Sequence, residues 1–273
     1  MSERPHTLLV APRPIYDESP ASWIQRVCQM HSNSYARLLG HLGIPAVSDP
    51  DIHLPVDHLC HIGRGTYVPE EPLRSMGSIF HAVRTLPRLS RLLNYDRRGS
   101  PAYRVCVHCL ATDAVPYLRI AWRFKDWRHC PIHFTQLIED CSRCHASIVS
   151  TRPSLGQTPS GRRFNVSDCA GCHASLLEGG PGKADPSIDG RTLVAQTSVV
   201  SAVLHGFFCI EGFRGRLGLD FFLWLRDNYS WHGVRVVPGG LCSPEEGLAV
   251  STIVRRLLKI YKDGSAATPP SLA

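Results

Sequence analysis

The pattern of apolar and polar positions near the N-terminus predicts two short helices. Ser19-Pro20 favours the start of the first, because serine is a good N-cap and proline is tolerated in the first helical turn. Polar residues 31–34 then interrupt the apolar spacing, and a second helical segment runs to Gly43, a residue type that commonly ends helices. Two helices joined by a few polar residues are typical of a helix-turn-helix motif, here over residues 19–43, although a plain helical hairpin has the same pattern.

Apolar spacing also predicts helices on both sides of a cysteine-rich centre. Residues 45–70 contain four prolines and are expected to form a loop, and a helical stretch follows it. Residues 191–264 are expected to be helical. Within them, Ser243-Pro244-Glu245-Glu246 has the pattern of a capping box that opens a last, basic helix over residues 243–262. Residues 265–273 are expected to be a disordered tail.

The cysteine-rich centre carries four pairs of metal-binding residues, each with two residues between its members. They are Cys106-x2-Cys109, Cys130-x2-His133, Cys141-x2-Cys144 and Cys169-x2-Cys172. Two such pairs close a four-coordinate zinc site with no open position for water, which makes the site structural rather than catalytic. Eight ligands therefore predict two structural zinc ions. The simplest pairing is sequential, with Cys106, Cys109, Cys130 and His133 on the first ion and Cys141, Cys144, Cys169 and Cys172 on the second. Ordinary buried or redox cysteines are the alternative.

The order of the ligands also matches the cross-braced RING finger of ubiquitin ligases. That scaffold would join the first pair to the third and the second pair to the fourth. RING spacing places only two or three residues between the histidine and the next cysteine, whereas seven residues, 134–140, stand there in this chain. The spacing therefore favours sequential sites.

The charge of the chain permits contact with nucleic acid without establishing it. The formal net charge is +7 and the isoelectric point about 8.9. Basic residues concentrate in two stretches, and the second alternates with Trp122, Phe124 and Trp127, a pattern that suits either nucleic acid or the mini-core of a small zinc module; we favour the mini-core for Trp122. The candidate contact residues are Arg84, Arg88, Arg91, Arg97, Arg98, Arg119, Arg123, Lys125 and Arg128.

Motifs for catalysis, export and membrane insertion are not found in the sequence. No Walker, nucleophile-elbow, zinc-protease or zinc-deaminase motif is present, so binding is expected rather than catalysis. No apolar run is long enough to cross a bilayer, and the first residues lack the layout of a secretory signal. We therefore expect a cytoplasmic protein, in which cysteines bind metal more often than they form disulfides.

Taken together, these residues resemble the TniQ family of bacterial transposon target-selection proteins, which includes TnsD and the TniQ subunits of CRISPR-associated transposons. The resemblance covers roughly residues 10–175. It is carried by Pro14-x3-Glu18-Ser19-x2-Ser22-Trp23-Ile24-x-Arg26, Arg104-Val105-Cys106-x2-Cys109, Trp122, Cys130-Pro131-Ile132-His133 and Cys141-x2-Cys144.

The resemblance implies a non-enzymatic adaptor for DNA transposition. Such an adaptor would link target DNA, or a CRISPR effector complex with its guide RNA, to the AAA+ ATPase of the transposon (TnsC or TniB), which recruits the transposase. DNA, RNA and a second copy of the chain are further expected partners. TnsD-type members are longer at the C-terminus, so the length of this chain favours a member that relies on a guide complex. A zinc-containing helix-turn-helix transcriptional regulator is the alternative function, and a RING-type ubiquitin ligase is a third.

The expected fold is mostly α-helical and divided into small domains. Residues 1–100 would hold the helix-turn-helix and further helices, and residues 101–178 a tandem zinc-finger module with short β-hairpins. Residues 179–190 would be a linker, and residues 191–264 a C-terminal helical region. The segment between the ligands Cys144 and Cys169, residues 145–168, has no assigned role.

Overall fold

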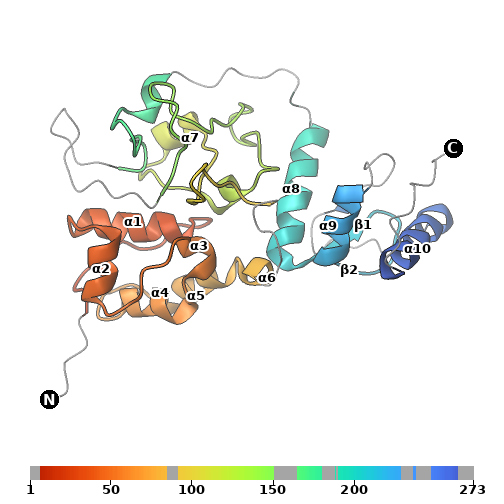
Figure 1. Ribbon diagram of the computed structural model, residues 1–273, viewed down its shortest axis with the longest axis horizontal. Helices are drawn as coiled ribbons and strands as arrows, with labels where there is room; N and C mark the ends of the chain where they lie inside the picture. The colour runs from red at the N-terminus through yellow and green to blue at the C-terminus, as the bar shows by residue number, and fades with distance from the viewer. Residues whose placement is uncertain are drawn as a thin grey trace, which may run out of the picture. The chain divides into compact units, whose positions relative to one another are not determined.

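The computed structural model describes residues 7–84, 92–150, 165–179, 188, 190–228, 236–237 and 247–263. The chain divides into two compact units, Met1–Ile188 and Asp189–Ala273. The described part is mostly helical, as the sequence pattern predicts (Figure 1). None of the described helices is long and apolar enough to cross a membrane. The predicted linker and tail, and residues 151–164 of the segment between Cys144 and Cys169, lie largely or wholly outside the described residues.

The first unit begins with a set of short helices. Both predicted N-terminal helices are present, and the serine caps form: the Ser19 side chain accepts a hydrogen bond from the Ser22 amide, and the Ser34 side chain accepts one from the Arg37 amide. The helices are α1 (Pro20–Met30), α2 (Tyr35–His41), α3 (Pro50–His53), α4 (Val56–Gly63), α5 (Glu70–Ser78) and α6 (His81–Arg84).

The expected loop at residues 45–70 is wrong, because α3 and α4 lie within it. Three of its four prolines, Pro50, Pro55 and Pro69, stand at helix starts instead of ending helices. Pro50 occupies the first turn of α3, where the Asp49 side chain accepts a hydrogen bond from the Asp51 amide. Pro55 stands directly before α4. A proline costs nothing at these positions because its missing N–H would have no partner inside the helix.

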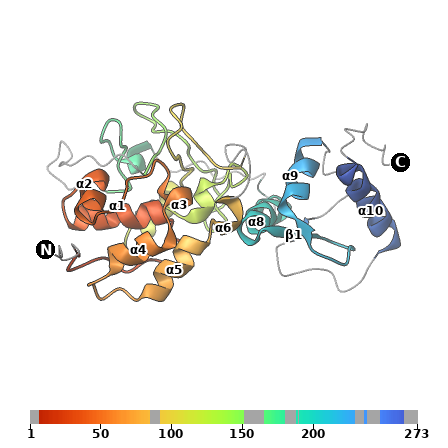
Figure 2. The same ribbon diagram turned by 60° about the horizontal axis from the view of Figure 1, so that its bottom comes forward.

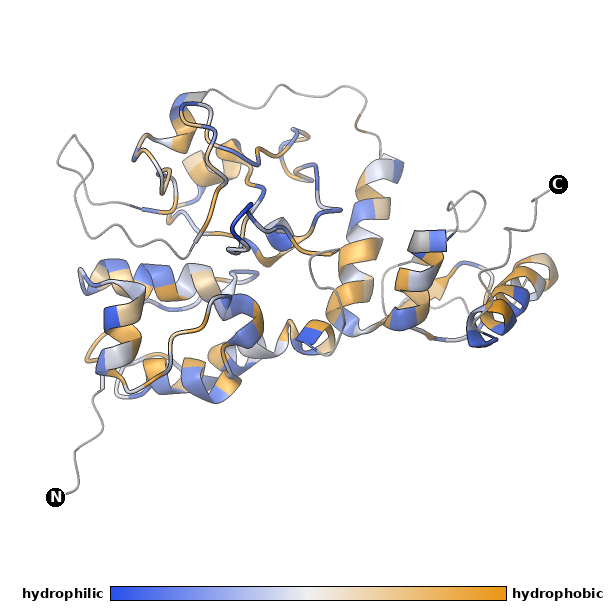
Figure 3. Cartoon of the chain, in the orientation of Figure 1, coloured by the Kyte–Doolittle hydropathy of each residue, from blue (hydrophilic) through white to orange (hydrophobic). Residues whose placement is uncertain are grey.

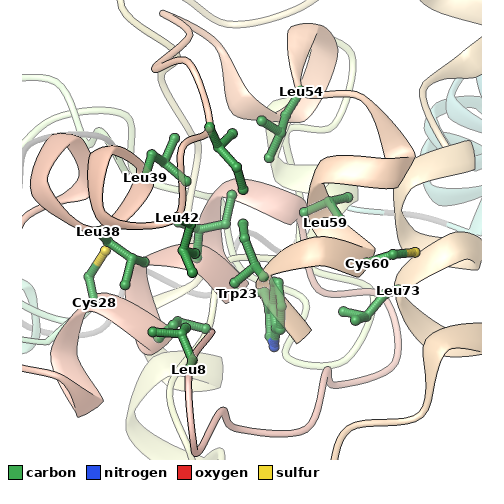
Figure 4. Packing of buried hydrophobic residues seen from close by; sticks show 14 of the residues in the cluster. Leu8, Trp23, Cys28, Leu38, Leu39, Leu42, Leu54, Leu59, Cys60 and Leu73 are labelled. Carbon is green, nitrogen blue, oxygen red and sulfur yellow. The ribbon is translucent and has the colours of Figure 1, made fainter. Parts of the chain in front are cut away.

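These helices enclose an apolar core around Trp23. Leu38, Leu42 and Leu59 gather around it, with Leu54 and Leu73 from neighbouring elements (Figure 4). Helices α4 and α5 approach each other closely at Gly77, since a Cβ atom built there would lie 2.9 Å from Leu59 Cδ1 and 2.9 Å from Val56 Cγ2. Burial of these aliphatic and aromatic side chains, at about 25 cal/mol per Å², is the main stabilising term for this helical half.

The second half of the first unit has little regular structure. It contains one helix, α7 (Val107–Thr112), and two 3-10 turns, η2 (Ile120–Arg123) and η3 (Leu176–Gly179), among its described residues. Isolated antiparallel bridges join His129 to Gln136, Asp140 to Ser147 and Asp168 to Ser175. Trp122 is buried in a second core cluster together with the cysteines, as expected for a residue of the mini-core.

The second unit contains a small sheet that the sequence pattern does not predict. Its elements are α8 (Gly190–His205), β1 (Phe207–Ile210), β2 (Leu217–Gly218), α9 (Leu219–Asn228), β3 (Val236–Val237) and α10 (Leu248–Lys262). The strands are antiparallel in the order β2-β1-β3, and β1 with β2 can be followed in Figure 2. The expectation of an all-helical C-terminal region is therefore wrong.

The core of the second unit is aromatic. Phe208 of β1 packs edge-on to Phe222 of α9 with ring centroids 5.3 Å apart, and Tyr261 of α10 packs on Phe221 at 5.3 Å. Helix α10 is amphipathic, with hydrophobic and hydrophilic residues visible side by side in Figure 3. It begins at Leu248; the capping-box residues 243–246 lie outside the described residues. Cys209 of β1 is disulfide-bonded, which departs from the expected reduced state of the cysteines.

Candidate metal centres

Three of the four ligand pairs lie on the same kind of tight hairpin turn. In each, the residue after the second ligand has a positive φ: 51° for Phe134, 57° for His145 and 60° for His173. The amide of that residue donates to the carbonyl of the first cysteine, at 2.9 Å in all three turns, for example from Phe134 to Cys130. The shared backbone turns each pair of side chains towards one point. The remaining pair differs, because Cys106 precedes helix α7 and Cys109 lies in its first turn.

The first cluster brings together Cys106, Cys109, Cys130 and His133. His133 Nδ1 lies 3.3 Å from Cys109 Sγ, 3.5 Å from Cys106 Sγ and 3.6 Å from Cys130 Sγ, and the sulfurs of Cys109 and Cys130 are 3.6 Å apart. A zinc ion with Zn–S bonds of about 2.3 Å requires tetrahedron edges of about 3.8 Å. The donor atoms therefore fit a zinc ion bound through Nδ1 of His133. The ring of His108 stacks on that of His133, with centroids 5.2 Å apart.

The second cluster brings together Cys141, Cys144, Cys169 and Cys172. Sγ of Cys141 lies 3.7 Å from that of Cys172, and Sγ of Cys144 lies 3.5 Å from that of Cys169. The Gly171 amide donates to Cys169 Sγ at 3.3 Å. Both clusters are thus positioned to bind one zinc ion each, as the spacing predicts, and their pairing is sequential. A cross-braced RING arrangement, which would join the first pair to the third, is excluded by this geometry.

The crowded sulfurs need a cation to become thiolates together. Hydrogen bonding with Cys106 raises the pKa of the Cys109 and Cys130 thiols, while contact with Cys109 lowers the pKa of Cys106. In the second cluster, burial raises the pKa of Cys169 to about 12. In the first cluster without metal, ionisation of Cys106 therefore opposes that of Cys109 and Cys130. A bound zinc ion supplies the positive charge that lets all of the thiols ionise.

Residues just before α1 and in its first turn hydrogen-bond to Leu118. They join the helical half of the first unit to the half that holds the metal clusters. Ser19 donates its amide to the Leu118 carbonyl at 3.0 Å, and the Ser22 hydroxyl accepts from the Leu118 amide at 2.9 Å. The same hydroxyl donates to Glu18 Oε1 at 2.9 Å, and Arg26 pairs with Glu18 Oε2 at 2.6 Å. The side chains of Glu18, Ser19, Ser22 and Arg26 each have a hydrogen-bond partner. The Glu-Ser-x2-Ser motif is therefore an internal fastening and not an exposed binding surface.

A second fastening is a buried ion cluster around Arg123. This side chain is fully buried and pairs with Asp49 Oδ2 at 2.6 Å and with Asp51 Oδ2 at 3.0 Å. The Tyr103 hydroxyl donates to Asp51 and lies 3.0 Å from the Ser19 hydroxyl. Burial raises the pKa of Asp51 to about 6, with Arg123 opposing the shift. The prediction that Arg123 contacts nucleic acid is wrong, because a charge paired in the interior cannot reach a phosphate.

Other predicted contact residues are also engaged within the fold. Arg119 donates to both carboxylate oxygens of Asp113, at 2.9 and 3.0 Å, and its guanidinium lies 4.5 Å from the ring centre of Tyr117. Arg84 donates to the carbonyls of Leu54 and Gly77. Four predicted residues are exposed, namely Arg97, Arg98, Lys125 and Arg128, and the remaining two, Arg88 and Arg91, lie outside the described residues.

Comparison with known protein families matches residues 9–137 to the TniQ family model. This chain carries a TniQ domain. The match confirms the resemblance in the sequence, and it includes the joint at α1 and all four ligands of the first cluster. No curated protein matches the chain.

The TniQ match ends before the second cluster begins. Its last residue, Leu137, stands four positions before Cys141.

The buried pair of Asp49 and Arg123 lies inside the TniQ domain, and the sequence pattern does not predict it. Its only signal was an aspartate placed before Pro50 in the manner of a helix cap, which says nothing of a partner 74 positions away.

Proposed function

We propose that this protein is a non-enzymatic target-selection adaptor in DNA transposition. The observation that carries the proposal is the TniQ match over residues 9–137, since a TniQ domain fits a transposition-associated protein. The closed ligand sets support it, because four protein ligands leave zinc no position for a reacting water. The chain's role would be to hold partners together, in the cytoplasm and at the nucleoid.

The internal fastenings support an adaptor in physical terms. A rigid adaptor keeps its two binding surfaces at a constant separation. Here the helices α1–α6 and the first cluster are joined by buried hydrogen bonds to Leu118 and by the ion pairs of Arg123. Partners bound to the two halves would therefore be held in register. We propose the AAA+ ATPase of the transposon as one partner. A target-bound complex, either a CRISPR effector with guide RNA or DNA itself, would be the other.

The pair α1–α2 is our candidate for a helix-turn-helix contact with DNA. The turn between the helices carries Ser32 in a left-handed conformation with φ of 48°, and α2 exposes Arg37, Gly40 and His41. The alternative of a DNA-binding transcriptional regulator rests on this same pair. Helix α2 has only seven residues, and Arg123 is withdrawn into the interior, so we rank the regulator second.

The decisive experiment is a binding assay with the full chain and the AAA+ ATPase encoded by a neighbouring gene, with and without the target complex. Binding in either arm supports the adaptor. Failure in both arms overturns it. Size-exclusion chromatography with light scattering of the same sample reports whether the chain forms the expected homodimer.

A DNA arm of the assay separates the adaptor from the regulator. The regulator requires tight, salt-dependent binding to one sequence, with Kd on the order of 10⁻⁸ M or below. Arg37→Glu on α2 should then abolish that binding. Arg74→Glu on α5, which reverses the charge of another exposed arginine, should leave it unchanged. Weak, sequence-blind binding argues for the adaptor.

A further inference from the structure

The two candidate zinc sites differ in which ligand faces solvent. In the first cluster the three cysteines are only 1%, 1% and 2% exposed, and the ligand closest to solvent is the imidazole of His133. In the second cluster Cys144 is exposed and Cys172 is half-buried. Thiolate sulfur is a nucleophile that peroxides oxidise, whereas imidazole nitrogen does not follow this chemistry. The clusters should therefore differ in their response to oxidants.

Gly171 lies next to two sulfurs of the second cluster and places no side chain against them. A Cβ atom built on Gly171 would lie 3.5 Å from Cys144 Sγ and 3.6 Å from Cys169 Sγ. The corresponding position in the turn of the first cluster is occupied by Ile132. A cavity of about 340 Å³ adjoins Gly171 and is also lined by Arg97, Arg98 and His145. Position 171 therefore carries no side chain that would shield the exposed Cys144 sulfur from a small oxidant.

We propose that Cys144 and Cys169 form an oxidation site, at which a peroxide produces a disulfide and releases zinc from the second cluster while the first cluster keeps its ion. The two sulfurs lie 3.5 Å apart and come from different turns of the same cluster. This proposal rests on the ligand geometry alone and is independent of the proposed function.

The reaction consumes one hydrogen peroxide for each cluster. The Cys144 thiolate attacks one peroxide oxygen, the O–O bond breaks, and a sulfenic acid and hydroxide result. The Cys169 thiolate then attacks the Cys144 sulfur, the S–O bond breaks, and a second hydroxide leaves. Each sulfur has lost one electron and the peroxide has gained two. Zinc, left with Cys141 and Cys172 as its only protein ligands, dissociates. A dithiol reductant reverses the oxidation, and added zinc refills the cluster.

The test uses the full zinc-loaded chain, treated with hydrogen peroxide in the presence of a chromogenic zinc chelator. One of the two zinc ions should be released, and peptide mapping of alkylated protein should find a disulfide between Cys144 and Cys169. Dithiothreitol with zinc should restore the original metal content. The buried thiols of Cys28 and Cys60 serve as internal controls and should remain reduced at the same dose.

Three matched variants separate the oxidation site from general lability. Cys144→His copies the Cys-x2-His pair of the first cluster, keeps four zinc ligands, and should slow zinc release by roughly tenfold or more. His133→Cys places a thiolate at the solvent-facing position of the first cluster and should make that ion releasable as well. Gly171→Ala should slow release by a smaller factor, although Ala146 Cβ, 3.1 Å from the added atom, must shift slightly.

The outcomes are distinct. Release of one ion with the Cys144–Cys169 disulfide, slowed in Cys144→His, supports the proposal. Release of both ions at one rate, release without this disulfide, or equal rates in wild type and Cys144→His overturns it. Should Cys144→His not retain zinc, the disulfide map of the wild type and the rate for Gly171→Ala still decide the question.

Discussion

The two candidate zinc clusters share one type of turn and almost the same ligands, yet they differ in the exposure of their ligands and in their links to the N-terminal helices. Both contribute cysteines to the buried core that contains Trp122, but the segment between the ligand pairs of the first is tied to the N-terminal helices through Leu118 and Arg123. The second follows the TniQ match and exposes one of its own ligands. The comparison teaches that ligand spacing specifies a metal site but not its role. The first cluster should support the whole TniQ domain, and the second should act locally.

Removal of one ligand from each cluster is the strongest test of this difference. Cys106→Ser and Cys141→Ser replace equally buried sulfurs, so the comparison is matched. Each variant should lose one of two zinc ions by elemental analysis. Because metal binding contributes directly to folding, Cys106→Ser should destabilise the first unit by several kcal/mol, a fraction of the roughly 10–16 kcal/mol that zinc supplies to small zinc-dependent domains, and Cys141→Ser by less. Chemical denaturation followed by tryptophan fluorescence measures both. Equal losses of stability would contradict the division of roles.

The next largest effect should come from the buried ion cluster of Arg123, Asp49 and Asp51, which joins the two halves of the first unit. Arg123→Met leaves Asp49 and Asp51 buried without their cation, and breaking a buried pair in this way costs about 3–5 kcal/mol. The triple variant Arg123→Met, Asp49→Asn, Asp51→Asn should recover part of that loss because no unpaired charge remains. Urea denaturation of both variants provides the measurement. A single variant as stable as wild type would show that the fastening is dispensable.

A smaller effect is expected at the joint itself. Ser22→Ala removes the hydroxyl that accepts from the Leu118 amide and donates to Glu18, leaving both groups buried without that partner. The expected loss is about 1–3 kcal/mol. Ser78→Ala on α5 is the control, since its exposed hydroxyl donates only to a carbonyl within its own helix. If Ser22→Ala and Ser78→Ala unfold at the same urea concentration, the Glu-Ser-x2-Ser motif does not stabilise the contact between the two halves of the first unit.

The sequence predicts those features of the molecule whose structure depends on neighbouring residues in the chain. The C-x2-C spacing depends on one tight turn, so the ligands and their sequential pairing could be read directly. Helices α1 and α2 carry a serine cap and apolar spacing within a single segment. Pro50 and Pro55 show the limit of such reading, because a proline can either end a helix or open one, and the choice depends on the residues that follow.

Features that depend on distant partners could not be read in this way. Arg123 belongs to a basic, aromatic stretch typical of a surface, and only the folding of Asp49 and Asp51 against it explains its burial. Strands β2 and β3 have two residues each, too few to show an alternating pattern. Each pairs with β1, which lies elsewhere in the chain, so their own residues do not reveal the pairing. A charged residue can therefore be assigned to the protein surface only when its partners in the fold are known.

Arg97 and Arg98 sharpen that last point, because they are the same residue type as Arg123 but exposed beside the second cluster. Arg97→Ala with Arg98→Ala should change stability by about 0.5 kcal/mol or less, since neither side chain is buried. If nucleic acid belongs to the bound target complex, the same variant should weaken binding uniformly across sequences and reduce the salt dependence, as loss of phosphate contacts does. Titration at several salt concentrations measures both quantities. An unchanged salt slope would remove this surface from the nucleic-acid interface.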